Sequence, residues 1–103
     1  KGARESLERA VELDPENALA WARLAEIQAS FGNLGKALSS AQEAAALEPN
    51  LSRTQTVLGF AYLSQVDTKK AKAAFEKAIT LDQADYLPRL GLGLAMIRDG
   101  DLN

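Results

Sequence analysis

A short acidic phrase returns in this chain at a fixed interval of 34 residues. It reads LDPENALAW from residue 13, LEPNLSRTQ from residue 47 and LDQADYLPR from residue 81. Self-similarity at a fixed period of this length is the signature of a repeat architecture, in which one supersecondary unit is stacked several times. A single unit cannot bury its own apolar face, so such a chain folds by packing each unit against its neighbours.

The same period aligns residues of similar character outside that phrase. Small residues recur at some positions, leucines recur at others, and a proline occupies two of the three copies of the turn. The aligned sets are Ala3, Ala37 and Ala71; Leu7, Ala41 and Phe75; Ala10, Ala44 and Ala78; Leu13, Leu47 and Leu81; Pro15, Pro49 and Gln83; Leu24, Leu58 and Leu92; and Ala25, Gly59 and Gly93. This regular spacing predicts helices of equal length that can stack.

Each period contains two helical patterns. The first is carried by Trp21, Leu24, Ala25 and Gln28, which are spaced i, i+3, i+4 and i+7. That spacing places all four side chains on one face of a helix. We predict helices over residues 2–13, 18–31, 34–47, 52–65, 68–81 and 86–98. Leu13 is expected to end the first helix on its buried side.

Breaking and capping residues separate the predicted helices. Pro15 cannot continue a helix, and Asn17 can cap the next one. Gly32 can adopt a positive φ and end a helix, and Asn33 can cap the helix that follows. These residues explain the recurring phrase, because each copy of it contains a helix stop, a turn and a helix start.

The corresponding turn in the next period has Val66 where the first has Gly32. A β-branched residue disfavours positive φ, so this turn is expected to have a different shape. Asp67 is its predicted N-cap. Ser52, with Gln55 three residues later, is interpreted as a capping box that opens the helix over residues 52–65.

Composition excludes several classes of function. The 103 residues include no cysteine and no histidine, which removes disulfides, thiolate metal sites and the commonest general base and metal ligand. A net charge of −2 argues against nucleic acid as a partner. The longest apolar run, residues 90–97, is too short to cross a bilayer. We therefore expect no enzyme activity, no cofactor, no metal and no membrane insertion.

Other charged or glycine-containing motifs have structural explanations. Acidic pairs in turns, Asp14 with Glu16 and Asp82 with Asp85, are interpreted as caps and solvated charges. The RDGDLN segment at 98–103 lacks the ligand spacing of a calcium loop. It is interpreted as a turn between paired helices, with Asp101 as the N-cap of the next helix. The GLG segment at 91–93 predicts tight helix packing, with Gly91 weakening the helix. The lysines at 69, 70, 72 and 77 predict a solvated basic face.

The repeat resembles the tetratricopeptide repeat, whose signature is W-x2-L-G-x2-Y, then A-x3-F, then P. One unit supplies Trp21, Leu24, Ala25, Ala37, Ala41 and Pro49, and the next supplies Leu58, Gly59, Tyr62, Ala71 and Phe75. The resemblance implies an all-α solenoid of antiparallel helix hairpins that wind as a right-handed superhelix. It also implies a half unit at 1–17, full units at 18–51 and 52–85, and a half unit at 86–103. The chain is accordingly expected to be a fragment of a longer protein.

The resemblance implies that the small residues Ala25, Gly59 and Gly93 mark the closest approach of paired helices. It also implies that the protein is an interaction scaffold, with a peptide or partner domain bound in a concave groove lined by the first helix of each unit. The groove positions are Arg23, Glu26, Arg53, Thr56, Phe60, Ser64, Leu94 and Arg98. Leu19, Ala22, Val57, Leu63, Leu90 and Ile97 are expected on the same surface.

Some relatives hold the tail of a chaperone with a lysine and asparagine clamp. Here those positions carry Ala22, Glu26 and Val57, so the clamp is absent from the units present. An alternative function is a structural spacer or self-association element within a larger protein. A homodimer would then form through exposed terminal helices, including a face with Leu92, Met96 and Leu102. The compartment is not encoded in these features, although the cytoplasm is slightly favoured for a soluble chain.

Overall fold

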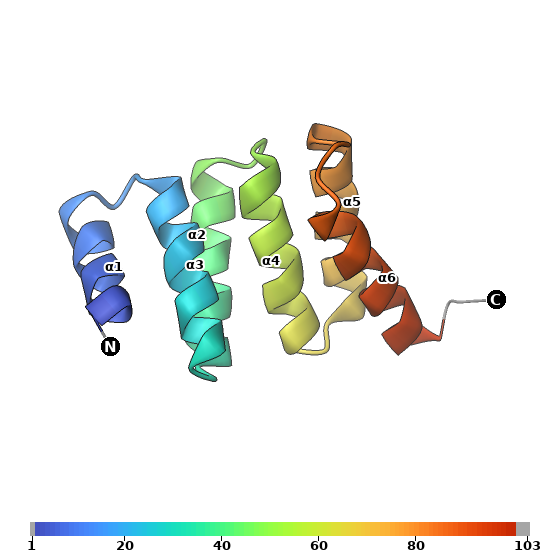
Figure 1. The fold of residues 1–103 in the computed structure, drawn as a ribbon, viewed down its shortest axis with the longest axis horizontal. Coiled ribbons are helices and arrows are strands. Elements are labelled where there is room, and N and C mark those ends of the chain that lie inside the picture. Colours follow the sequence, from blue (N-terminus) through green and yellow to red (C-terminus); the bar gives the residue numbers. More distant parts are fainter. Residues whose placement is uncertain (1, 101–103) are drawn as a thin grey trace.

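The computed structural model describes residues 2–100, which form six α-helices and no β-strand. The helices are α1 (Gly2–Leu13), α2 (Ala18–Ser30), α3 (Leu34–Leu47), α4 (Ser52–Ser64), α5 (Thr68–Leu81) and α6 (Leu87–Asp99). They stand side by side in a row 47 Å long, with α2, α4 and α6 nearer the viewer in Figure 1 and α3 and α5 behind them. The predicted all-α solenoid of helix hairpins is confirmed.

Helix boundaries agree with the prediction to within one residue, and two of the expected N-caps, Asn17 and Asp67, make capping hydrogen bonds. The side chain of Asn17 accepts a hydrogen bond from the backbone N–H of Ala20 at 3.2 Å. Asp67 accepts one from the N–H of Lys70 at 3.3 Å. The carbonyl of Pro15 accepts the indole N–H of Trp21 at 2.8 Å, which fastens the first turn to α2.

Two capping predictions are wrong. Asn33 occupies the N-cap position of α3, but its side chain makes no capping hydrogen bond. The capping box fails because Leu51 is the N-cap of α4, which leaves Ser52 one residue too far inside the helix. The Ser52 hydroxyl donates instead to the carbonyl of Ala78 on α5 at 3.1 Å, and the Gln55 amide donates to the carbonyl of Pro49 at 2.9 Å. These bonds join neighbouring segments.

The turn at Val66 has the same shape as the turn at Gly32, contrary to prediction. Gly32 has φ of 81° and Val66 has φ of 62°. In each turn the next residue donates its N–H to a carbonyl five residues back, from Asn33 to Gln28 at 2.9 Å and from Asp67 to Tyr62 at 3.0 Å. Because these bonds and the packed helices fix the turn, Val66 is held in a region that β-branched residues disfavour.

The core is built mainly from alanines, with Phe75 as the largest fully buried side chain. Alanines of α2, α3 and α4 form one cluster, against which Trp21, Leu38 and Leu58 pack. Leu24, Ala25 and Ala71 are buried as their family positions imply, whereas Tyr62 is half-buried and Pro49 lies in an exposed turn.

Leu13 does not lie in the core. It is 75% exposed, which contradicts the prediction that it ends the first helix on its buried side. Leu81 at the equivalent position of α5 is also exposed, whereas Leu47 at the end of α3 is half-buried. The predicted N-cap Asp101 and the apolar Leu102 lie outside the described residues.

Helices approach closely at one of the two expected glycines and at a third glycine, Gly91. A Cβ placed on Gly59 would lie 2.5 Å from the Phe75 ring, so the predicted close packing at Gly59 is confirmed. Gly93 has nothing within 4 Å of such a Cβ. Gly91, which seemed only to weaken its helix, lies against the Phe75 ring at 2.3 Å by the same measure. The glycine that permits α6 to approach α5 is therefore Gly91.

Candidate functional site

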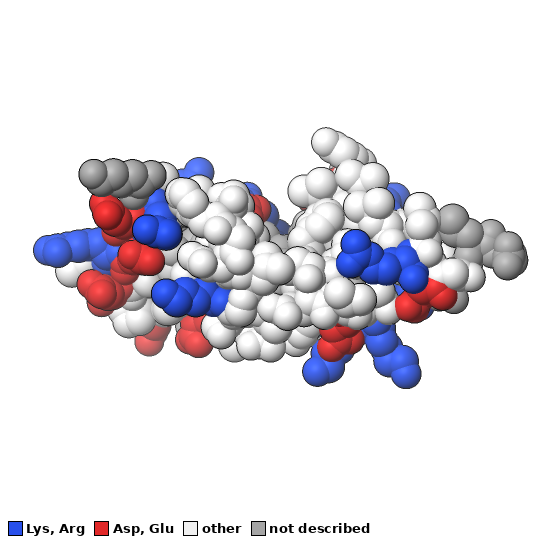
Figure 2. Space-filling model, turned by 90° about the horizontal axis from the view of Figure 1, so that it is seen from below, with Lys and Arg blue, Asp and Glu red and all other residues white. Residues whose placement is uncertain are grey.

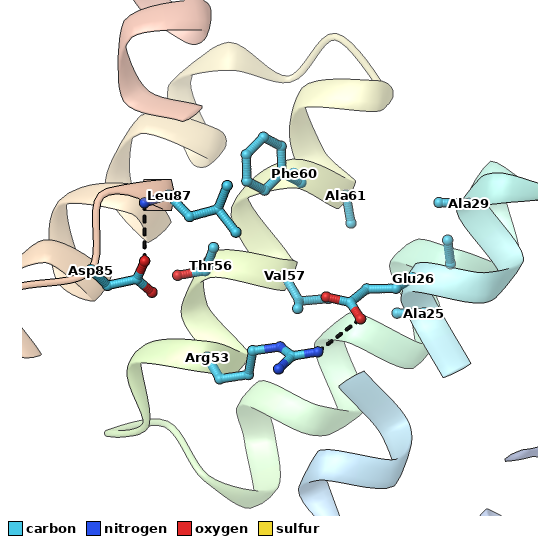
Figure 3. Close-up of a pocket in the computed structure, with 11 residues that line it drawn as sticks. Ala25, Glu26, Ala29, Arg53, Thr56, Val57, Phe60, Ala61, Asp85 and Leu87 are labelled. Atoms are coloured by element: carbon cyan, nitrogen blue, oxygen red, sulfur yellow. Dashed lines mark hydrogen bonds and ion pairs between the residues drawn. The ribbon is translucent and has the colours of Figure 1, made fainter. Parts of the chain in front are cut away.

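The side of the row formed by α2, α4 and α6 is hollowed, as Figure 2 shows near the middle of its upper edge. We call this surface the concave groove. It contains a cavity of about 240 Å³ between α2, α4 and the start of α6 (Figure 3). The lining residues are Ala25, Glu26, Ala29, Ala37, Arg53, Thr56, Val57, Phe60, Ala61, Asp85 and Leu87. Most of this lining is apolar.

The two helices that flank the cavity supply different side chains. Alanines of α2 form one wall, and Phe60 of α4 with Leu87 of α6 forms the opposite wall. The short alanine side chains leave the space that the cavity occupies. Ordered water needs polar partners, and a space lined mainly by small apolar side chains offers few of them. Such a space suits an apolar group of matching size.

An ion pair stands at one side of the cavity. A guanidinium nitrogen of Arg53 lies 2.8 Å from Oε1 of Glu26, and both side chains are about half exposed. The pair links α4 to α2 across the groove, as the dashed line in Figure 3 shows. The charge of Arg53 is therefore already partly balanced within the chain.

Arg23 differs from Arg53 in this respect. It is exposed on α2, and within residues 2–100 it has no hydrogen-bond or ion-pair partner. A second hollow, between α1, α2 and α4, is lined by both Arg23 and Arg53 together with Leu7 and Leu19. The unpaired Arg23 and the ion-paired Arg53 therefore line the same hollow. This hollow adjoins the apolar cavity, because Arg53 lines both.

Four of the predicted groove residues line the cavity: Glu26, Arg53, Thr56 and Phe60. Thr56 is nevertheless buried, and its hydroxyl donates to the carbonyl of Ser52 at 2.9 Å. The Thr56 hydroxyl proton is therefore already used in a hydrogen bond within α4. Ala22, also expected on this surface, is fully buried under α4 and cannot contact a ligand.

The other predicted residues lie farther along the row. Ser64 donates its hydroxyl to the carbonyl of Ala61 at 2.7 Å. Leu94 is exposed on α6, and Arg98 donates to the carbonyl of Leu63 at 3.4 Å. None of these three lines the cavity, so the predicted set divides between the cavity and the surface of α6.

Leu87 and Asp85 are among the cavity residues that the sequence analysis did not place in the groove. Leu87 stands at the repeat position of Leu19 and Arg53, so the 34-residue period contained the signal that would have found it. Asp85 was interpreted as a cap, and its carboxylate does accept the N–H of Leu87 at 3.0 Å. The same residue also lines the cavity, a position that depends on how the turn before α6 folds over α4.

Neither a metal site nor a membrane span is found in the described part of the chain. Within residues 2–100, no group of three or more acidic side chains is placed so that it could hold a metal ion. No helix in that range is both long and apolar enough to cross a membrane.

Comparison with known proteins identifies the repeat. Two family models described as tetratricopeptide repeat match the chain, one over residues 1–52 and the other over residues 52–85. The chain belongs to the tetratricopeptide repeat family. No curated protein matches this tetratricopeptide repeat (TPR) chain in sequence.

Solved structures of TPR domains have the same fold. The Sgt2 TPR domain from Aspergillus fumigatus matches with a TM-score of 0.88 and 24% identity, over 95% of this chain and 66% of that one. MamA matches with a TM-score of 0.83 and 29% identity, over 94% of this chain and 53% of that one. The chain therefore spans less than two thirds of these two relatives.

A third TPR structure is described as the first TPR of Spaghetti (RPAP3) bound to the HSP90 peptide SRMEEVD. It matches with a TM-score of 0.84 and 17% identity, over 91% of this chain and 75% of that one. Identity at this level shows a shared fold.

Proposed function

We propose that this TPR chain is a protein-interaction scaffold that binds an extended peptide segment of a partner protein in its concave groove. The observation that carries the proposal is the apolar cavity between α2, α4 and α6, which adjoins a hollow lined by the free cation Arg23. A concave, mostly apolar site with a few polar groups beside it is the usual form of a ligand site. We assign the chain no enzymatic activity and no nucleic-acid partner.

The cavity favours an apolar side chain as the anchor of the ligand. Its walls are alanines on one side and Phe60 with Leu87 on the other, and its volume of about 240 Å³ is limited. Removing an apolar side chain from water contributes about 25 cal/mol for each Å² buried, so one leucine- or methionine-sized anchor can supply most of the affinity. A charged anchor would lose its hydration without gaining a partner on these walls.

An acidic group on the ligand is favoured next to the anchor. Arg23 carries an unbalanced charge in the adjoining hollow, whereas Arg53 is held by Glu26. A carboxylate placed there would gain a charge-assisted hydrogen bond from Arg23 without first breaking an ion pair. The preferred ligand is therefore a peptide with an apolar residue and an acidic residue a short distance apart.

The peptide complex of the Spaghetti TPR supports this proposal at the level of the fold. The peptide bound in that complex, SRMEEVD, contains apolar and acidic residues. The lysine and asparagine clamp that the family uses for chaperone tails is replaced here by Ala22, Glu26 and Val57. We therefore do not expect the free carboxylate of a chaperone tail to be the feature that this groove recognises.

A peptide array tests the proposal. The array presents internal segments in which one position varies among leucine, methionine, alanine and lysine, and a nearby position varies between glutamate and glutamine. We expect the chain to prefer the apolar and glutamate combination, and Arg23→Glu to weaken binding by at least about tenfold, the loss of one charged hydrogen bond. Lys36→Glu on α3 is the matched control, since it makes the same charge change outside the groove.

Two further results decide the outcome. Phe60→Ala should weaken the leucine and methionine peptides more than the alanine peptide, because it enlarges the cavity that holds the anchor. Circular dichroism checks that each variant keeps its helices. If Arg23→Glu and Lys36→Glu bind every peptide equally well, the groove is not the ligand site.

A further inference from the structure

The helix at one end of the row corresponds to the second helix of a hairpin, and the helix at the other end corresponds to the first. In the row, α2 pairs with α3 and α4 pairs with α5, while α1 and α6 stand at opposite ends (Figure 1). The 34-residue period makes α1 the equivalent of α3 and α5, and α6 the equivalent of α2 and α4. We propose that α6 of one copy pairs with α1 of a second copy, so that the chain associates with itself head to tail.

The face of α1 that would enter this pairing consists of Ala3, Ser6, Leu7 and Ala10. The equivalent residues are Ala37, Ser40, Ala41 and Ala44 in α3, and Ala71, Ala74, Phe75 and Ala78 in α5. All eight of these equivalents are buried. In α1, by contrast, Ala3 and Ser6 are exposed and Leu7 and Ala10 are only half-buried. The α1 face therefore has the residues that contact the first helix of a hairpin, but no such helix covers it within residues 2–100.

The face of α6 shows the complementary opening. Its Gly93 is the equivalent of Ala25, which is buried, and of Gly59, which lies against the Phe75 ring. Gly93 itself has nothing within 4 Å of an added Cβ. Since Leu7 is the equivalent of Phe75, the Leu7 side chain of the second copy would lie on Gly93 as Phe75 lies on Gly59.

A second stripe on α6 is open for the same reason. Leu90 is 51% exposed, although its equivalents Ala22 and Thr56 are almost fully buried. Leu94 and Ile97, one and two turns farther along the helix, are exposed as well. Ala22 is covered by the neighbouring helix α4, because Ala22 and Val57 belong to one cluster. In the proposed assembly, α2 of the second copy would cover Leu90 in the same way.

The end of α6 has the geometry that this pairing needs. Gly100 has φ of 76°, close to the 81° of Gly32 and the 62° of Val66, which stand at the same repeat position. In the complete hairpins this left-handed residue directs the chain from the first helix toward the second. Helix α1 begins at the equivalent of Lys70, the third residue of α5, so its length matches that of a second helix of a hairpin.

Pairing of two different surfaces is heterologous, and in a solenoid it leaves one free end of each kind. The assembly therefore grows with concentration and does not stop at a symmetric dimer. An α6-to-α6 dimer would cover the apolar stripe of α6 but would leave the α1 face open. The two arrangements are separable by experiment.

Analytical ultracentrifugation of the 103-residue chain and two blocked variants tests the proposal. Ala3→Glu blocks the α1 face, and Gly93→Glu blocks the α6 face. Ala3 is exposed, and a Cβ added to the half-buried Gly93 has nothing within 4 Å, so both changes leave the core packing in place. Over about a hundredfold range of concentration, the parent chain should increase in mean mass, since association follows mass action. Each blocked variant alone should remain a monomer. An equal mixture should form a 1:1 heterodimer of twice the monomer mass and nothing larger, because only one open pair of faces remains.

Matched controls are Ala46→Glu and Gly35→Glu, which add the same charge at exposed positions of α3 away from both faces. They should associate as the parent chain does, with unchanged circular dichroism. The proposal is overturned if the parent chain is monomeric throughout. It is also overturned if the Ala3→Glu variant alone still dimerises, which would indicate α6-to-α6 contact, or if the mixture stays monomeric.

Discussion

Gly91 of α6 lies directly against the ring of Phe75 of α5, so closely that a Cβ on Gly91 would be 2.3 Å from Cζ of the ring. The ring cannot retreat, because Gly59 of α4 lies on it at a similarly short distance and Phe75 is fully buried. Phe60 packs edge-on against the same ring, with centroids 4.9 Å apart. These contacts fix the spacing of α4, α5 and α6, and hence the width of the groove.

Gly91→Ala is therefore expected to destabilise the chain, despite the better helix propensity of alanine. An overpacked core costs about 1–3 kcal/mol, which exceeds the gain of up to about 1 kcal/mol from replacing a helical glycine. Gly93→Ala in the same helix should raise the free energy of unfolding by up to about 1 kcal/mol, since its Cβ meets open space. Urea denaturation monitored by circular dichroism measures both.

The pair of variants contains its own control, because the two glycines lie two residues apart on one helix. Combining Gly91→Ala with Phe75→Leu should recover part of the loss caused by overpacking, as a smaller side chain makes room for the new methyl group. Equal effects of Gly91→Ala and Gly93→Ala on stability would show that the Phe75 contact does not limit this site.

Val66 is expected to be a strained residue of the turn between α4 and α5. A φ of 62° costs an L-residue roughly 1–2 kcal/mol of strain, which Val66→Gly would relieve. Part of this gain is offset because glycine has greater conformational freedom in the unfolded chain. We expect Val66→Gly to raise the free energy of unfolding by up to about 1 kcal/mol. The reverse change at the equivalent turn, Gly32→Val, should lower it; an increase there would contradict the strain argument.

The period in the sequence predicted the helices of this fold because it repeats the large and small side chains that pack the hairpins. It did not predict the turn at Val66, since residue preference there is overruled by backbone hydrogen bonds to Leu63 and Tyr62. Nor could it distinguish Gly91 from Gly93, because their difference depends on which face of α6 meets Phe75. Local preference decided the helix ends, whereas tertiary packing decided these exceptions.

The groove was predictable to a similar degree. The resemblance to the TPR family implied that Glu26, Arg53 and Phe60 share one surface, and all three line the cavity. It could not predict that Arg53 pairs with Glu26, which is 27 residues away, because that contact depends on the distance between α2 and α4 and on the side-chain rotamers. That Arg23 lacks a partner within residues 2–100 while Arg53 has one is likewise a feature of the packed structure.

The pair of Arg53 and Glu26 is expected to contribute little to stability. Both side chains are nearly half exposed, and exposed ion pairs are typically worth about 0–1 kcal/mol. A double-mutant cycle of Arg53→Ala and Glu26→Ala should give a coupling energy in that range, and added salt should reduce it. A coupling energy well above that range, or one insensitive to salt, would indicate that the pair is a rigid part of the groove.

Asp99 should make stability depend on pH at the acidic end. Hydrogen bonds from Lys72, at 2.7 Å, and from Thr68 lower the pKa of Asp99 below its ordinary value of 3.8. A carboxyl whose pKa is lower in the folded chain than in the unfolded chain stabilises the fold above the unfolded value, and this contribution is lost as pH falls through the folded value. The stability difference between the parent chain and Asp99→Asn should therefore be constant above about pH 5 and shrink below pH 3.8.

Carbon NMR of the Asp99 carboxyl measures its pKa directly, and urea denaturation at several pH values measures the stability difference. Glu76→Gln is the control, because it removes one negative charge from an exposed side chain of α5. Lys72→Met should raise the pKa of Asp99 toward its ordinary value, since it removes the largest cause of the shift. If the parent chain and Asp99→Asn lose stability in parallel as the pH falls, the contact between α5 and the end of α6 is not held by the charge of Asp99.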